Sequence, residues 1–68
     1  MGKLDNNQKK FLNKVIELVA VHVGRKNAQN LVYNSSFYKT LFNDPVFVMY
    51  YEPDDWAKEI IQKSKVAI

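Results

Sequence analysis

Apolar residues recur at helical spacing over the first third of the chain. One arc of a helical wheel is filled by Phe11, Leu12, Val15, Ile16, Leu18, Val19, His22 and Val23. Asp5 followed by Gln8 has the pattern of a capping box, and Gly24 can take the left-handed conformation in which helices often end. The pattern predicts a helix from Asn6 to Val23.

A second amphipathic pattern covers the end of the chain. Pro53 suits the first position of a helix, and Asp54 and Asp55 place negative charge at the positive end of its dipole. The residues that share one face are Trp56, Ala57, Ile60, Ile61, Ser64 and Ala67. Two acid-before-base pairs at i,i+4 spacing, Asp54 with Lys58 and Glu59 with Lys63, also favour a helix. We predict this helix from Pro53 to about Lys65.

Turn-forming residues divide the middle of the chain. Asn27 is a candidate cap for a short helix that ends near Tyr33, and the Asn-Ser-Ser sequence at 34–36 interrupts the pattern. Positions 37, 38, 41 and 42 are apolar or aromatic at the spacing of one helix face. Asp44 and Pro45 suit the cap and first position of a further helix.

Residues 46–51, Val-Phe-Val-Met-Tyr-Tyr, are apolar or aromatic at every position. Such a run fits either a strand or a short buried helix. A strand would need a partner, and only residues 31–33 could supply one. We therefore predict an all-α fold: two long amphipathic helices at the ends, packed on an aromatic-rich middle of one to three short helices. The alternative is an α+β fold with residues 46–51 as a strand.

Length and composition predict a single small domain over residues 1–68. Cys is absent, so a disulfide or a thiolate metal site is excluded, and a hydrophobic content of 47% argues against a disordered chain. Domains of this size need dense apolar packing or a partner subunit, and a homodimer is one expected state.

The start of the chain has no apolar segment typical of a secretory signal, and its apolar runs are too short to span a membrane. We expect a cytoplasmic protein without a membrane partner. The many Lys and Asn residues are typical of AT-rich coding sequence and favour a bacterial, plasmid or phage origin.

The net charge of +3 is distributed unevenly. Residues 1–30 hold six basic and two acidic side chains, whereas residues 31–68 hold four basic and five acidic ones. An acidic partner would therefore be attracted to the first half of the chain.

No set of residues in the sequence points to catalysis. His22 is the single histidine, without a nucleophile motif to accompany it, and the two glycines are too far apart for a phosphate-binding loop. The acidic residues Glu52, Asp54 and Asp55 fit an ordinary helix start better than a cation site. We predict a protein that is not an enzyme and has no cofactor or metal.

Eight of the nine aromatic residues lie between Tyr33 and Trp56. A small core accounts for part of this group, and we assign Phe37, Leu41, Phe47, Trp56 and Ile60 to it. The four tyrosines exceed what such a core needs, and Tyr is enriched at protein interfaces. The first hypothesis is therefore a non-enzymatic protein-interaction module, an adaptor, regulator or inhibitor. Its partner-binding residues would be Tyr38, Met49, Tyr50 and Tyr51, with a basic rim from Lys10, Lys14 and Arg25.

The alternative hypothesis is a small DNA-binding regulator of the helix-turn-helix type. Ala20 and Gly24 have the spacing found at the turn of that motif, and a polar helix would follow. Its base-reading residues would be Arg25, Lys26, Asn27, Gln29 and Asn30, which are of the types that bind guanine and adenine edges.

Overall fold

The described part of the chain folds into five helices. The computed structural model describes the backbone of residues 4–66 and the side chains of residues 4–64. The helices are α1 (Asn6–Val23), α2 (Arg25–Tyr33), α3 (Ser36–Asn43), α4 (Pro45–Tyr50) and α5 (Pro53–Val66). No strand occurs between residues 4 and 66, so the all-α prediction is confirmed and the alternative strand at 46–51 is wrong.

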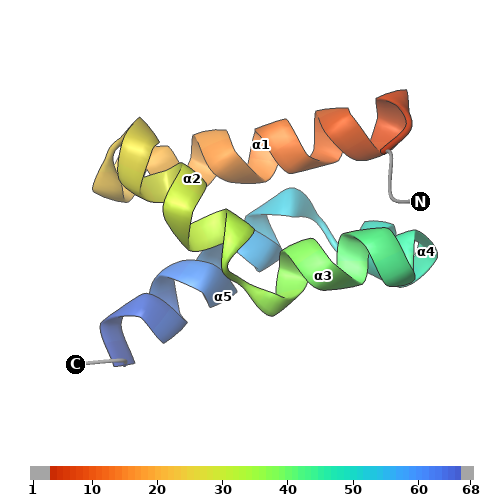
Figure 1. The fold of residues 1–68 in the computed structure, drawn as a ribbon. Coiled ribbons are helices and arrows are strands. Elements are labelled where there is room, and N and C mark those ends of the chain that lie inside the picture. The colour runs from red at the N-terminus through yellow and green to blue at the C-terminus, as the bar shows by residue number, and fades with distance from the viewer. Residues whose placement is uncertain (1–3, 67–68) are drawn as a thin grey trace.

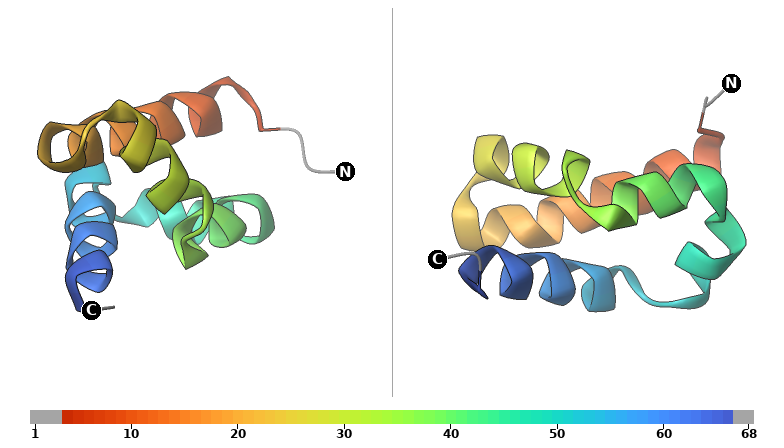
Figure 2. Two further views of the ribbon diagram at one scale, coloured as in Figure 1. Left: turned by 60° about the vertical axis from the view of Figure 1, so that its left-hand side comes forward. Right: turned by 60° about the horizontal axis from the view of Figure 1, so that its bottom comes forward.

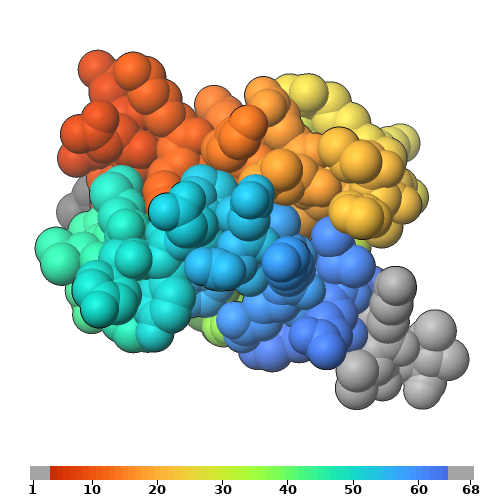
Figure 3. All heavy atoms as spheres, turned by 180° about the vertical axis from the view of Figure 1, so that it is seen from behind, coloured from red at the N-terminus to blue at the C-terminus, as the bar shows by residue number. Residues whose placement is uncertain are grey.

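The helices run back and forth in three passes (Figures 1 and 2). α1 extends along one side, α2, α3 and α4 return in the opposite direction, and α5 leads away from α4 again. α1 packs against both α2 and α5 and is the central contact element of the fold. From behind, the link after α4 and the start of α5 lie directly along α1 (Figure 3).

The predicted capping box starts α1. The backbone N–H of Gln8 donates to Asp5 Oδ1 at 2.8 Å, and the N–H of Asp5 donates to Gln8 Oε1 at the same distance. The Nε2 of Gln8 also donates to the carbonyl of Leu41 at 3.1 Å. This carbonyl belongs to the last turn of α3, whose C=O groups lack partners within the helix. Gln8 therefore ties the start of α1 to the end of α3.

Only Gly24 separates α1 from α2. Its φ of +89° and ψ of 155° lie outside the left-handed helical region that we expected. The positive φ nevertheless favours glycine at this position. Asn27 does not cap α2, because that helix already begins at Arg25. Its side-chain amide donates instead to the carbonyl of Val23 at 2.9 Å, one of the free carbonyls at the end of α1.

Residues 45–50 form a helix because neighbouring residues in the sequence determine where this helix begins and ends. Asp44 Oδ1 accepts a hydrogen bond from the N–H of Phe47 at 3.2 Å, and Pro45 occupies the first helical position. Pro53 disfavours helical geometry in the residue before it, so the helix must end upstream. Tyr51 is already extended, with φ −98° and ψ 162°. α5 then starts at Pro53 as predicted and ends one residue later than expected.

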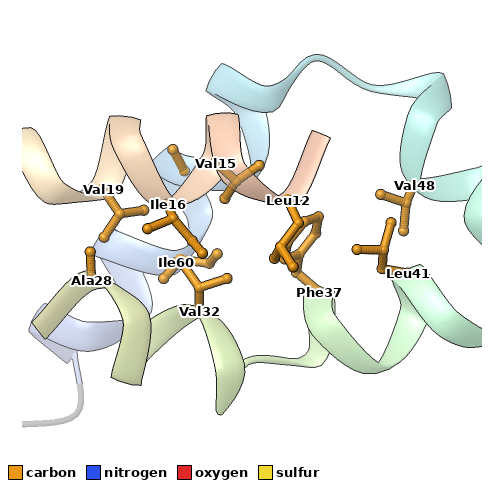
Figure 4. Close-up of a cluster of buried hydrophobic side chains, with 11 residues drawn as sticks. Leu12, Val15, Ile16, Val19, Ala28, Val32, Phe37, Leu41, Val48 and Ile60 are labelled. Atoms are coloured by element: carbon orange, nitrogen blue, oxygen red, sulfur yellow. The ribbon is translucent and has the colours of Figure 1, made fainter. Parts of the chain in front are cut away.

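All five helices contribute to one apolar core (Figure 4). Its buried members are Leu12, Val15, Ile16, Val19, Ala28, Val32, Phe37, Leu41, Val48, Ala57 and Ile60. The core prediction is wrong for Phe47, which is 45% exposed. His22, at the edge of the apolar arc and in the last turn of α1, is exposed as well. Ala67 lies outside the described residues.

We expect Gln8→Glu to destabilise the protein, although a helix start normally prefers a carboxylate. The dipole would gain about 0.3–1 kcal/mol, but the donor to the Leu41 carbonyl is lost and a charge faces its oxygen, which costs about 1–3 kcal/mol. Urea unfolding followed by circular dichroism measures the difference.

Asn7→Asp adds the same charge to the same helix turn without touching Leu41, and it should be neutral or stabilising. At pH 3 the introduced carboxyl is protonated and can donate again, so the deficit relative to the parent should shrink. A stabilised Gln8→Glu protein at pH 7 would contradict the assigned role of Gln8.

Candidate functional site: an aromatic corner and its groove

Exposed apolar side chains gather at α4. Among the described residues, six large apolar or aromatic side chains are exposed, and four of them lie within residues 46–51. These four are Val46, Phe47, Tyr50 and Tyr51. α4 buries only Val48, because six residues make less than two turns and one side chain reaches the core. Val46, Phe47 and Tyr50 of this helix therefore remain exposed.

Phe47, Tyr51 and Trp56 contact one another edge to face. The ring centroids of Phe47 and Tyr51 are 5.5 Å apart, those of Tyr51 and Trp56 5.9 Å, and those of Phe47 and Trp56 6.3 Å. Tyr50 extends the group, with its ring 5.4 Å from that of Tyr51. We call these four residues the aromatic corner. Edge-to-face pairs at such distances are favourable beyond their buried area, so the rings support one another's positions.

Trp56 anchors the aromatic corner to the rest of the protein. Its indole Nε1 donates to the carbonyl of Val48 at 2.9 Å, which connects the first turns of α5 to α4. Its ring lies 5.3 Å from that of Phe37, which is buried in the core. One side chain therefore contacts the core, the backbone of α4 and the exposed rings.

A groove of about 360 Å³ opens beside the aromatic corner, between α3, α4 and α5. The rings of Phe47, Tyr51 and Trp56 form its apolar side. Its polar side consists of two hydroxyls of α3 and two carboxylates of α5, from Ser36, Thr40, Asp55 and Glu59. A second hollow of about 440 Å³ lies between α2, α3 and α5 and shares Ser36, Trp56 and Glu59 with the first. The two hollows are therefore neighbours at Trp56.

The predicted partner-binding residues do not all come together. Tyr50 and Tyr51 lie in the aromatic corner, and Met49 is partly buried on the same helix. Tyr38 belongs to a separate cluster on α2 and α3, with its ring 4.9 Å from Tyr33 and 5.0 Å from Phe42. It is partly buried and packs against the core.

The sequence reasoning missed Phe47 and Trp56 as surface-forming residues, and it missed the carboxylates that line the groove. Phe47 and Tyr51 are four residues apart, a spacing that could have placed them on one side of a short helix. The position of Trp56 beside them depends on how α5 folds back on α4, for which the sequence holds no local signal.

The five residues of the DNA-binding hypothesis all lie on α2 and are all exposed. Arg25 and Lys26 stand in its first turn, and the helix carries no acidic residue. The side chain of Asn27 is already engaged with the carbonyl of Val23, which leaves Gln29 and Asn30 as the free amides. Lys10 and Lys14 are exposed on α1.

The structure addresses metal binding and membrane insertion for the residues that it describes. No group of three or more His, Cys, Asp or Glu residues is close enough to hold a metal ion. None of the described helices is long and apolar enough to cross a bilayer.

Comparison of the chain with models of protein families, with curated proteins and with solved structures gives no match. Functional inference therefore depends on the geometry of the site.

We expect Trp56→Phe to loosen α4 while the core persists. Phenylalanine keeps an aromatic ring but has no N–H to donate to Val48, and the free energy of unfolding should fall by about 1–2 kcal/mol. In NMR spectra the Cα shifts of residues 45–50 should move toward random-coil values, whereas those of α1 should not. Phe47→Leu, which removes an exposed ring but no hydrogen bond, is the control. Unchanged shifts across α4 would refute the anchoring role of Trp56.

Proposed function

We propose that this protein is a non-enzymatic interaction module that binds another protein through the aromatic corner. The main support is the concentration of exposed rings on α4 and at Tyr51, which directly follows it. The side chain of Tyr50 is 81% exposed. Contiguous apolar surface is disfavoured in a small monomeric protein unless a partner covers it. Tyr and Trp are also the residue types that dominate binding energy at interfaces.

The construction of the aromatic corner supports the same proposal. The rings pack edge to face, and Trp56 is held by a hydrogen bond and by Phe37. A partner would meet a surface that is already ordered, so little side-chain entropy would be lost on binding. A second copy of the chain is the alternative occupant, and it would place the same surface of both copies in one two-fold contact.

Photo-cross-linking inside cells that naturally make the protein tests this proposal. A photoreactive amino acid replaces either Tyr50 or Val21, two side chains that are equally exposed at 81% and 80% but lie on different helices. We expect a discrete adduct of defined mass from position 50 and none from position 21. Tyr51→Ser should reduce the adduct by about tenfold, in line with the loss of an interface aromatic.

Equal adduct patterns from positions 50 and 21 would show that exposure alone causes the labelling, and the proposal would fail. An adduct of twice the mass of the chain would identify a second copy as the occupant of the surface. The Val21→Ser protein serves as the matched control for loss of an exposed apolar side chain.

DNA binding through α2 is the second candidate function, favoured by the exposed basic and amide side chains on a helix without acids. It predicts retention on duplex DNA at low salt that declines steeply as salt rises. Arg25→Ala and Lys26→Ala should each reduce the salt slope by about one, whereas Lys58→Ala on α5 should not. Equal effects of all three substitutions, or no retention at low salt, would remove this candidate.

A further inference from the structure

The groove beside the aromatic corner is lined by negatively charged side chains as well as by rings. Two carboxylates, Asp55 and Glu59, line it together with three rings, and no basic residue is among the side chains that line it. We propose that this groove binds the guanidinium group of an arginine on a basic segment of the partner protein. The proposal rests on the interaction function above and adds the chemistry of the partner.

The aromatic side of the groove suits a cation. The rings of Phe47, Tyr51 and Trp56 line the groove together and stand at 66–73° to one another. Cations are attracted to the faces of aromatic rings, most strongly to Trp. The hydrogen bond from the indole N–H of Trp56 to the carbonyl of Val48 favours the position of its ring beside the groove.

The polar side of the groove favours arginine over lysine. A guanidinium is planar, stacks on aromatic faces and donates five hydrogen bonds in a fixed fork, whereas an ammonium is a compact and strongly hydrated charge. Asp55 and Glu59 stand one helical turn apart on α5 and offer acceptors along the groove. The hydroxyl of Thr40 donates to the carbonyl of Ser36 at 2.8 Å, which leaves its oxygen free to accept.

In the free protein, Lys63 partly neutralises this site. Its Nζ lies 3.1 Å from Glu59 Oε2, but its side chain is 68% exposed and borders the neighbouring hollow. An ion pair of this exposure is weak and screened by salt. An incoming arginine that also stacks on rings can displace it, and Lys63 acts as a competitor for Glu59.

The distribution of charge along the chain also affects where a basic segment would bind. Acidic residues exceed basic ones from residue 31 onward, whereas residues 1–30 carry a surplus of four positive charges. A basic segment is therefore disfavoured at α1 and α2 and favoured at the groove, which is lined by two acidic residues and no basic one. The basic half of a second copy fits less well, because such a head-to-tail contact cannot form a closed two-fold dimer and needs a ring or a filament of copies to be satisfied.

Titration with a short peptide probe tests the proposal. The probe has one arginine flanked by leucines, and its neutral twin carries citrulline in place of arginine. Trp56 is the single tryptophan, so its fluorescence and its indole NMR signal report on the groove. We expect the arginine peptide to shift both signals and to bind at least about fivefold more tightly than its twin. A peptide with lysine in the same place should bind more weakly than the arginine peptide.

Matched variants separate the groove from general electrostatics. Glu59→Gln and Asp55→Asn should each weaken the arginine peptide about threefold, whereas Glu17→Gln, the same charge change on α1, should not. Asparagine retains an oxygen for the N–H of Glu52, which Asp55 now accepts at 3.3 Å. Lys63→Met should strengthen binding by freeing Glu59, and Lys14→Met should leave it unchanged.

Equal binding of the arginine and citrulline peptides, or equal effects of Glu17→Gln and Glu59→Gln, would overturn the proposal. Growth in mass with protein concentration that salt abolishes would assign the groove to a second copy and would also overturn it. The cross-linking result at position 50 is independent of these titrations. A positive result there with no preference for arginine would retain the interaction function and reject the arginine site.

Discussion

The indole of Trp56 is the contact on which both the packing of α4 and the shape of the surface depend. α4 has six residues and one buried side chain, too little to hold a helix in place by apolar burial alone. The hydrogen bond from Trp56 to Val48 supplies a directional contact to the α4 backbone, and the ring of Phe37 continues it into the core. Without this side chain, α4 would keep its packing on α3 and Val48 as its one buried side chain.

The short helices explain why so much aromatic surface is exposed. α1 is long enough to direct four buried side chains at the core, whereas each of the three short helices directs one or two. A chain with nine aromatic residues cannot bury them all behind so few inward positions. Phe37 occupies the core, Trp56 lies at its edge, and Phe47, Tyr50 and Tyr51 are left outside. The surplus is a consequence of geometry, and it leaves a small domain with exposed rings of the types that are enriched at protein interfaces.

The helices could be predicted well because capping residues and prolines in the sequence mark where several of them begin. Asp5 with Gln8 fixed the start of α1, and proline marked the starts of α4 and α5. The helical state of residues 46–51 was favoured over a strand mainly because no partner strand was available. Asn27 was misjudged because a single glycine allows α2 to follow α1 at once, and Phe47 because an apolar run does not reveal which side faces the core.

The candidate site was predicted only in part, for a physical reason. At least one of Tyr50 and Tyr51 could be expected at the surface, because adjacent residues cannot both point inward, and both are in fact exposed. Tyr38 was grouped with them by proximity in sequence, but it lies on α3 and packs against Tyr33 and Phe42. The groove, which Asp55 and Glu59 line together with the rings, depends on how α5 returns past α4. Contacts of this kind depend on tertiary packing, which local propensity does not encode.

Buried and exposed positions of the chain should respond differently to substitution. Phe37, Leu41 and Val48 are buried, so substitutions there would alter stability and binding together. Val46, Phe47, Tyr50 and Tyr51 contribute less to the core, and the carboxylates of Asp55 and Glu59 lie on the exposed side of α5. Trp56 belongs to both groups, because it holds α4 and borders the groove. If the proposed function holds, substitutions at the outer positions would change partner preference while Trp56 keeps the position of α4, so that specificity and folding would be separated in a chain too small to hold two cores.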